Sequence, residues 1–187
     1  RLKKRNPALY QSLMEEARKE YAIAEKDYID KLDKAELEFY YSEPFGYNPR
    51  GQYPGHTTRL MIDFANILTL LNLPPKSKIL EVGCGSAWIS IFLSKMGYTV
   101  FAIDIAEDKI KIAREKACQY NTNIEFIVED AERYTCNQQY DAIFFHDSLH
   151  HVLDERKVLQ NCFNALNEGG KLLLIEPGEK HSKSKLA

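Results

Sequence analysis

Glycines and acidic side chains recur at the ends of apolar segments in the middle of the chain. The first group is Glu81-Val-Gly-Cys-Gly85, in which two glycines one residue apart follow a short apolar run. Glycine adopts backbone conformations that other residues avoid, so this segment can turn sharply and pass close to a ligand. Asp104 stands 23 residues after Glu81, and Asp130 ends another apolar segment. A carboxylate placed like Asp104 can accept hydrogen bonds from both hydroxyls of a ribose, so the pattern indicates a nucleotide-type crevice.

A second group of reactive side chains lies in the segment YDAIFFHDSLHHV, residues 140–152, which contains His146, His150 and His151. Histidine titrates near neutral pH and can take a proton from a hydroxyl or an amine. Three histidines beside Asp147 also raise the possibility of a metal site. Only His146 and His150 have the spacing of a helical pair, on a stretch that we do not expect to be helical throughout. We therefore predict no metal.

The glycine turn does not fit the common phosphate-binding motifs. The dinucleotide fingerprint G-x-G-x-x-G requires a third glycine where this chain has Trp88, and no Lys-Ser or Lys-Thr pair follows to make a phosphate loop. A carboxylate at Glu81 would repel a pyrophosphate and suits a cationic or hydroxyl-bearing ligand. A turn with a purely structural role remains the alternative at this point.

Glu-x-Gly-x-Gly after a hydrophobic strand resembles the first motif of the class I S-adenosylmethionine-dependent methyltransferases. The family usually has a third small residue where this chain has Ala87. The resemblance covers about residues 60–177 and implies that S-adenosylmethionine is the cofactor. The cofactor-binding residues that it implies are Glu81, Gly83, Cys84, Gly85, Asp104, Ile105, Asp130, Ala131 and His146.

The resemblance also implies individual roles. Asp104 would bind the ribose, although it is also placed to cap the next helix. Asp130 would accept a hydrogen bond from the adenine amine, with the backbone amide of Ala131 and the side chain of Ile105 against the ring. A turn residue is the alternative for Asp130. Cys84 occupies a position where the family needs only a small residue, so we do not expect it to be a nucleophile.

The segment at 140–152 resembles the fourth-strand region of small-molecule methyltransferases, where an "LHHV"-type ending recurs. This likeness places His146 near the methionine part of the cofactor. His150 and His151 would lie beside the methyl acceptor and are the predicted catalytic residues. The helix before the first strand would lie against the amino-acid end of the cofactor, where His56 or Arg59 is a candidate to hold the carboxylate.

Apolar runs and helical periodicity alternate after the glycine turn. We expect strands at 79–82, 99–103, 124–128, 142–145 and 171–175, and helices from residue 86, at 107–120 and at 154–166. The pair at 169–170 is expected to form the turn before the last strand. Such alternation predicts an α/β fold, a Rossmann-like doubly wound, mostly parallel sheet with right-handed crossovers. The chain ends 12 residues after Ile175, so we expect the sheet to be truncated after the fifth strand, without the last strands that the family usually has.

The N-terminal third is expected to form a helical extension. Residues 7–39 are predicted to form one helix with a single apolar stripe, which packs on the domain, on a partner, or over the active site as a lid. The segment 39–54 is rich in tyrosine, phenylalanine and proline and is predicted to be a loop that covers the cofactor or braces the helix. Thr57 or Thr58 is expected to cap a helix that ends at residue 71. We predict two parts, an extension at 1–56 and a methyltransferase domain at 57–187.

Composition excludes several other classes. The chain has 187 residues, a net charge of -2 and a pI near 6.3, so no basic field indicates a nucleic-acid partner. No apolar run approaches the length of a membrane span, and the basic start RLKKRNP has no apolar segment behind it, so we expect neither a membrane partner nor a secretory signal. The four cysteines lack metal spacing and are expected to be reduced, as in a cytoplasmic protein.

The sequence thus predicts an S-adenosylmethionine-dependent methyltransferase with a small-molecule acceptor. An NAD-dependent oxidoreductase fits less well because of Trp88, and a nucleic-acid methyltransferase usually has Asn/Asp-Pro-Pro-Tyr where this chain has His146-Asp-Ser-Leu149. A module that keeps the cofactor fold without turnover is the remaining alternative.

Overall fold

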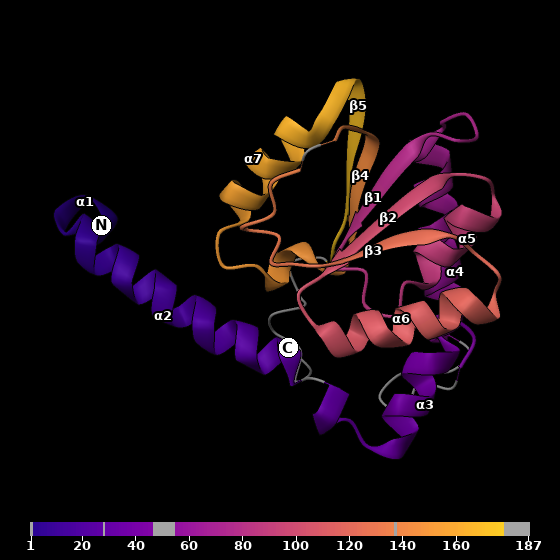
Figure 1. The fold of residues 1–187 in the computed structure, drawn as a ribbon, viewed down its shortest axis with the longest axis horizontal. Helices are drawn as coiled ribbons and strands as arrows, with labels where there is room; N and C mark the ends of the chain where they lie inside the picture. Colours follow the sequence, from indigo (N-terminus) through magenta and orange to yellow (C-terminus); the bar gives the residue numbers. More distant parts are fainter. Residues whose placement is uncertain (1, 28, 47–54, 137, 178–187) are drawn as a thin grey trace.

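A five-stranded parallel sheet forms the centre of the protein (Figure 1). The computed structural model describes residues 2–27, 29–46, 55–136 and 138–177. Strand order is β3-β2-β1-β4-β5, and every neighbouring pair is parallel. The predicted Rossmann-like α/β class is confirmed. The strands are β1 (Lys78–Val82), β2 (Thr99–Asp104), β3 (Ile124–Val128), β4 (Tyr140–His146) and β5 (Leu166–Ile175).

The strand order reverses between β1 and β4. The chain runs outward from β1 to β3, then returns to the other side of β1 for β4 and β5. Crossover loops leave in opposite directions at this point, so a crevice opens at the carboxyl ends of the two central strands.

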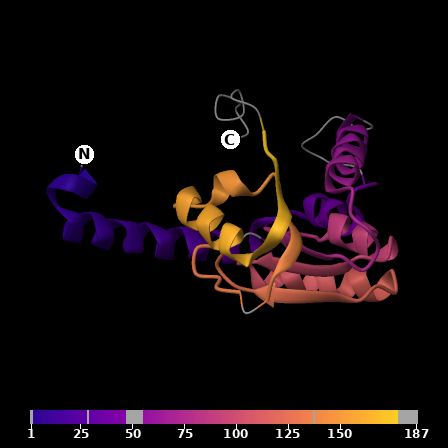
Figure 2. The same cartoon turned by 90° about the horizontal axis from the view of Figure 1, so that it is seen from above.

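Alternate residues of β1 face different apolar cores on the two sides of the sheet. Ile79 of β1 packs with the helices α4 and α5, whereas its neighbour Leu80 faces the layer that contains α7. Figures 1 and 2 show the helices on the two sides of the sheet, which is the doubly wound arrangement. Each fully buried leucine, isoleucine or phenylalanine stabilises the fold by roughly 1.5–3 kcal/mol. The helices of the domain are α4 (Gly55–Leu71), α5 (Trp88–Lys95), α6 (Glu107–Gln119) and α7 (Glu155–Ala165).

The N-terminal region contains two principal helices, so the prediction of one continuous helix over 7–39 is wrong. A capping box restarts the helix at Asp33: its Oδ1 accepts the N–H of Glu36 at 2.9 Å, and Glu36 Oε2 accepts the N–H of Asp33 at 3.0 Å. This Asp-x-x-Glu signal is present in the sequence. The elements here are α1 (Leu2–Arg5), α2 (Pro7–Lys26), η1 (Ile29–Lys31) and α3 (Lys34–Ser42).

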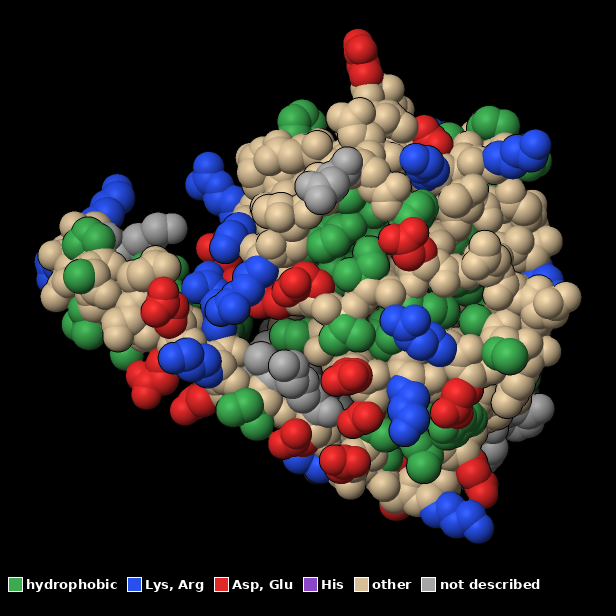
Figure 3. Space-filling view, viewed as in Figure 1, with side chains coloured by type: hydrophobic (Ala, Val, Ile, Leu, Met, Phe, Trp, Pro, Cys, Tyr) green, Lys and Arg blue, Asp and Glu red, His purple; other side chains and the backbone are tan. Residues whose placement is uncertain are grey.

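The first part of α2 projects away from the sheet (Figures 1 and 2). Leu9 and Leu13 are each 46% exposed, and Figure 3 shows hydrophobic side chains among charged ones on this helix. The apolar stripe predicted here therefore does not pack on the domain along its whole length. The helix meets the domain through Arg18, whose Nε lies 2.5 Å from Glu132 Oε2.

Several predicted boundaries shift. Because α3 continues to Ser42, the start of the loop predicted at 39–54 is helical, and its part at 47–54 lies outside the described residues. Neither threonine begins α4: the helix starts at Gly55, and Thr57 Oγ1 donates to the carbonyl of Pro44 at 3.0 Å. Helix α5 begins at Trp88, because Ala87 has a left-handed φ of 55°.

The last strand is longer than predicted. Leu166 already pairs with Tyr140, and Lys171 pairs with Ala142 after a register shift. Gly169 and its neighbour therefore lie in an irregular part of β5, not in a turn before it. Within the described residues, no helix has the length and apolar character needed to cross a membrane.

Candidate cofactor and active site

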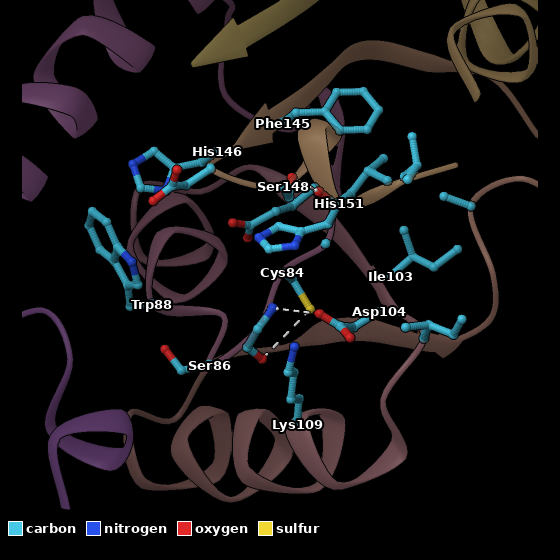
Figure 4. Close-up of a pocket in the computed structure, with 18 of the residues that line it drawn as sticks. Cys84, Ser86, Trp88, Ile103, Asp104, Lys109, Phe145, His146, Ser148 and His151 are labelled. Carbon is cyan, nitrogen blue, oxygen red and sulfur yellow. Dashed lines mark hydrogen bonds between the residues drawn. The ribbon is translucent and has the colours of Figure 1, made fainter. Parts of the chain in front are cut away.

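A cavity of about 370 Å³ lies at the carboxyl edge of the sheet, where the order of strands reverses. Residues at the ends of β1, β2, β3 and β4 line it, together with residues from α2, α3 and α4. In Figure 4, Asp104 and Lys109 lie toward one end, His146 and Trp88 toward the other, and His151 between them. The predicted cofactor residues all line this cavity: Glu81, Gly83, Cys84, Gly85, Asp104, Ile105, Asp130, Ala131 and His146.

Each glycine of the turn is required by a different neighbouring segment. Gly83 and Gly85 have φ of 74° and 51°, in the left-handed region. A Cβ on Gly83 would lie 2.5 Å from the Cβ of Ser148, in the loop after β4. A Cβ on Gly85 would lie 2.8 Å from the hydroxyl of Tyr40, on α3. The turn therefore fits closely between β4 and the N-terminal extension.

Glu81 hydrogen-bonds within the protein. It is 3% exposed, and its Oε2 accepts the N–H of Ser90 at 3.1 Å and the hydroxyl of Ser90 at 2.5 Å. Burial raises the pKa of Glu81 to about 8. These contacts join the end of β1 to α5 and so set the direction of the helix that follows the glycine turn.

Asp104 organises the same turn from the end of β2. Its Oδ2 accepts the N–H of Gly85 at 2.9 Å, and its Oδ1 accepts the N–H of Ala106 at 2.9 Å. Ala106 is the N-cap residue of α6, and no side chain caps that helix. The helix-cap interpretation of Asp104 is therefore wrong. Each carboxylate oxygen has a further acceptor position, so Asp104 can still receive ligand hydroxyls.

Asp130 and Ala131 follow β3 at the outer end of the cavity. Asp130 Oδ1 accepts the N–H of Glu132 at 2.8 Å, and the guanidinium Nε of Arg133 lies 3.8 Å from Asp130 Oδ2. Ile105 lines the cavity from the neighbouring strand end. Polar and apolar groups thus meet where the resemblance places the adenine.

Cys84 is an inert thiol in this setting. It is 5% exposed, and burial, with the nearby carboxylates of Asp104 and Glu81, raises its thiol pKa well above the ordinary value. A nucleophilic cysteine needs the opposite shift. All four cysteines, Cys84, Cys118, Cys136 and Cys162, are free.

The three histidines have different surroundings. His146 ends β4, with its Nε2 3.3 Å from Asp63 Oδ2 and its ring perpendicular to Trp88 at 5.9 Å. His151 lines the cavity, in the short helix η2 (Leu149–His151). His150 is not among the lining residues.

His150 contacts two groups beside the cavity. Its Nδ1 lies 2.6 Å from Glu176 Oε2, and its ring stacks on His151 with the centroids 4.1 Å apart. Glu176 Oε1 also accepts the N–H of Ser148 at 3.1 Å and that of Leu149 at 2.8 Å. Glu176 thus holds both the loop and one histidine, and sequence reasoning missed it.

Arg18 and Glu132 were also missed. Arg18 lines the cavity from α2, and Glu132 Oε1 accepts the N–H groups of Leu153 and Asp154 at 2.9 and 3.0 Å. Arg18 and Glu132 are 114 residues apart. No short-range pattern connects them, so the sequence carried no usable signal.

The N-terminal extension lines the end of the cavity near β1 and β4. Ser86 Oγ donates to Glu43 Oε2 at 2.7 Å. Lys116 Nζ donates to the carbonyls of Glu43 and Tyr40 at 3.1 and 3.4 Å. Lys116 is only 2% exposed, and burial lowers its pKa to about 8. These contacts dock the C-terminal end of α3 onto α6 and the glycine turn.

Helix α4 contributes further polar groups to this end. Arg59 Nη2 lies 3.7 Å from Asp147 Oδ2. Within the described part of the chain, two buried atoms of the lining, His56 Nε2 and Asp147 Oδ1, have no hydrogen-bond partner. Buried polar atoms are normally paired, so this end of the cavity suits a polar ligand.

Comparison with known proteins agrees with this geometry. Residues 79–170 match a family model described as a methyltransferase domain. The ubiquinone biosynthesis O-methyltransferase of Xanthomonas axonopodis pv. citri is 31% identical over 103 residues, 54% of this chain and 43% of the relative. The Coxiella burnetii enzyme of the same name is 36% identical over 95 residues, 50% of this chain and 41% of the relative. The chain thus spans less than half the length of these curated relatives.

Solved structures share the fold. The PH0226 protein from Pyrococcus horikoshii has a TM-score of 0.62 at 28% identity, over 78% of this chain and 64% of the other. Coclaurine N-methyltransferase, bound to N-methylheliamine and S-adenosylhomocysteine (SAH), has a TM-score of 0.63 at 15% identity, over 83% and 50% of the two chains. At 15% identity, the similarity to coclaurine N-methyltransferase shows only a shared fold.

Proposed function

We propose that the chain is a class I S-adenosylmethionine-dependent methyltransferase that transfers a methyl group to a small-molecule acceptor, because residues 79–170 match the model of a methyltransferase domain. The observation that carries this proposal is the set of groups at consecutive strand ends. Asp130 follows β3, Asp104 ends β2, and Gly83 and Gly85 follow β1, all lining one cavity.

The order of the strands suggests which way the cofactor would lie along the cavity. Asp130, Ala131 and Ile105 would receive the adenine at the outer strand, and Asp104 would accept the ribose hydroxyls. The methionine portion would then extend past the glycine turn toward His146. The unpartnered atoms of His56 and Asp147, with the guanidinium of Arg59, lie where its charged groups would be held.

Two of the proposed cofactor residues act mainly by shaping the site. Glu81 holds α5 through Ser90, and Cys84 is a small buried residue between the two glycines. We propose that both keep the turn close to the cofactor.

The cofactor supplies a methyl group on a sulfonium, which is already activated for displacement. The main task of the protein is therefore to align the acceptor and exclude water, and alignment can contribute roughly 7–11 kcal/mol. His151 lines the cavity and is the proposed base that takes the proton from the acceptor hydroxyl or amine. His150 would act through His151, because its ring stacks on His151 and Glu176 fixes its orientation. A positioned base contributes about 10²–10⁴-fold.

The N-terminal extension, proposed as residues 1–56, would complete the site of the domain at 57–187. Tyr40 and Glu43 line the cavity from α3, and Arg18 lines it from α2. The relatives named O-methyltransferases favour a hydroxyl acceptor. The four free cysteines support a reducing compartment such as the cytoplasm.

Binding and turnover can be tested separately. Calorimetry with S-adenosylmethionine and SAH should show micromolar-range binding. Mass spectrometry should then detect methylation within a panel of phenols, amines and carboxylic acids. No heat and no thermal shift with either ligand at millimolar concentration would exclude the proposal. Binding without turnover of any panel compound by the full-length chain would favour a cofactor-binding module instead.

A further inference from the structure

A carboxylate from the N-terminal extension lies at the methionine end of the cavity. Glu43 follows α3, lines the cavity, and accepts the Ser86 hydroxyl at 2.7 Å through Oε2. It lies 36 residues before the segment that matches the family model, which begins at residue 79. The family match therefore says nothing about Glu43.

The backbone around Glu43 is held in place by the domain. Its N–H donates to the carbonyl of Phe39 at 2.8 Å, and its carbonyl accepts Lys116 Nζ at 3.1 Å. One turn earlier, the hydroxyl of Tyr40 lies against Gly85. The Glu43 side chain is thus presented to the glycine turn from a fixed helix end.

Burial of the Glu43 carboxyl favours a positively charged partner in the cavity. Burial raises the pKa of the Glu43 carboxyl, against the opposing effects of the Ser86 hydroxyl and of Lys116, His146 and Arg59. An ionised carboxylate in such a place is stabilised by a nearby positive charge. One hydrogen bond from Ser86 leaves further acceptor positions on the two oxygens.

Glu81 is less suited to this role although it lines the same cavity. It is 3% exposed, and its Oε2 already accepts two hydrogen bonds from Ser90. Asp104 is likewise engaged with two backbone N–H groups and lies toward the ribose end. Among these three acidic groups around the glycine turn, Glu43 is the one that is contributed from outside the sheet and faces the methionine end.

We infer that the Glu43 carboxylate binds the α-ammonium group of the cofactor, an inference that rests on the proposed function. Arg59, on the facing helix α4, would take the α-carboxylate. The N-terminal extension would then recognise the amino-acid part of the ligand, while the strand ends recognise the nucleoside.

Two ligands separate this role from a structural one. SAH carries the amino-acid portion, whereas 5′-methylthioadenosine contains the same nucleoside and lacks it. The variant Glu43→Gln keeps the shape of the side chain and removes its charge. We expect it to weaken SAH binding in calorimetry by about tenfold or more, the usual value of a charge-assisted hydrogen bond. Binding of 5′-methylthioadenosine should not change.

Glu38→Gln is the matched control. Glu38 is on the same helix, its side chain is 71% exposed, and its recorded ion pair is with Lys34. Its loss should leave the affinity for both ligands unchanged. If Glu43→Gln weakens both ligands equally, or neither, Glu43 is only a brace and the inference is wrong. If the wild-type protein binds neither ligand, the proposed function itself fails.

A second test changes the ligand instead of the protein, so it does not depend on how well the variant folds. The deaminated analogue of SAH lacks the ammonium group, so wild-type protein should bind it about tenfold more weakly than SAH. In Glu43→Gln that difference should largely disappear, because the two changes remove the same interaction. Equal affinity of the wild-type protein for SAH and its deaminated analogue would overturn the inference.

Discussion

The carboxylate of Asp104 accepts a hydrogen bond from the backbone N–H of Gly85 at 2.9 Å, so the end of β2 holds the turn that follows β1. One side chain therefore supports the glycine turn and also faces the proposed ribose site. The two tasks are physically linked, because the same oxygens serve both.

Replacing Asp104 by alanine should affect both binding and stability. SAH affinity should fall by about 1.5–3 kcal/mol for each ribose hydrogen bond lost. The melting temperature should fall too, since the N–H groups of Gly85 and Ala106 lose their acceptor. Calorimetry and thermal unfolding measure the two effects. Glu107→Ala, an exposed change in the first turn of α6, is the control, and unchanged SAH affinity in Asp104→Ala would exclude the ribose role.

The buried carboxyl of Glu81 should make stability depend on pH. Its pKa is about 8 in the folded protein and near 4.5 when exposed, so between these values the folded state holds the extra proton. Stability is then fully present below about pH 4.5 and decreases as the pH rises toward 8, by at most about 1.4 kcal/mol per pH unit for one group. Denaturant unfolding of Glu81→Gln should show a shallower decrease over this window. Parallel pH profiles for variant and wild type would contradict the assignment.

The C-terminal part of α3 should become better protected when a cofactor analogue binds. Tyr40 and Glu43 line the cavity, so a ligand there contacts their helix directly. Hydrogen exchange with and without SAH should show slower exchange at 39–46. Protection at 81–85 with no change at 39–46 would leave this segment a structural brace.

Lys116→Met should loosen the same segment without a ligand. The amine donates to the carbonyls of Tyr40 and Glu43, and methionine fills a similar volume without a donor. Exchange at 34–46 should become faster while the strands keep their protection. Lys111→Met, an exposed change on the same helix, should have no such effect, and identical exchange in both variants would argue against the docking role of Lys116.

His151 and His150 should differ in their effect on turnover. With an acceptor identified from the panel, His151→Gln should lower kcat by about 10²–10⁴-fold while SAH affinity stays unchanged. His150→Gln should have a smaller effect, because His150 acts through the orientation of its neighbour. A larger loss in His150→Gln than in His151→Gln would reverse the two roles.

The sequence by itself was sufficient for the sheet and for the residues at its edge. Short apolar runs define β1 to β4. Parallel strands bring their carboxyl ends to one edge of the sheet, and this does not depend on the conformation of the connecting loops. Asp104, Asp130 and the two glycines were therefore predictable as neighbours. The Asp33-x-x-Glu36 capping box was also available in the sequence, and overlooking it produced the wrong single helix at 7–39.

Tertiary structure alone decided which distant groups complete the cavity. Arg18 meets Glu132 across 114 positions, and Ser86 meets Glu43 across 43. Periodicity reports how a segment presents its own side chains to its near neighbours. It contains no information on where a separate helix docks, because docking depends on the shapes and charges of two surfaces that exist only after folding. The same reason explains the histidines: His150 and His151 are adjacent in η2 and their rings stack, yet His150 contacts Glu176 whereas His151 lines the cavity.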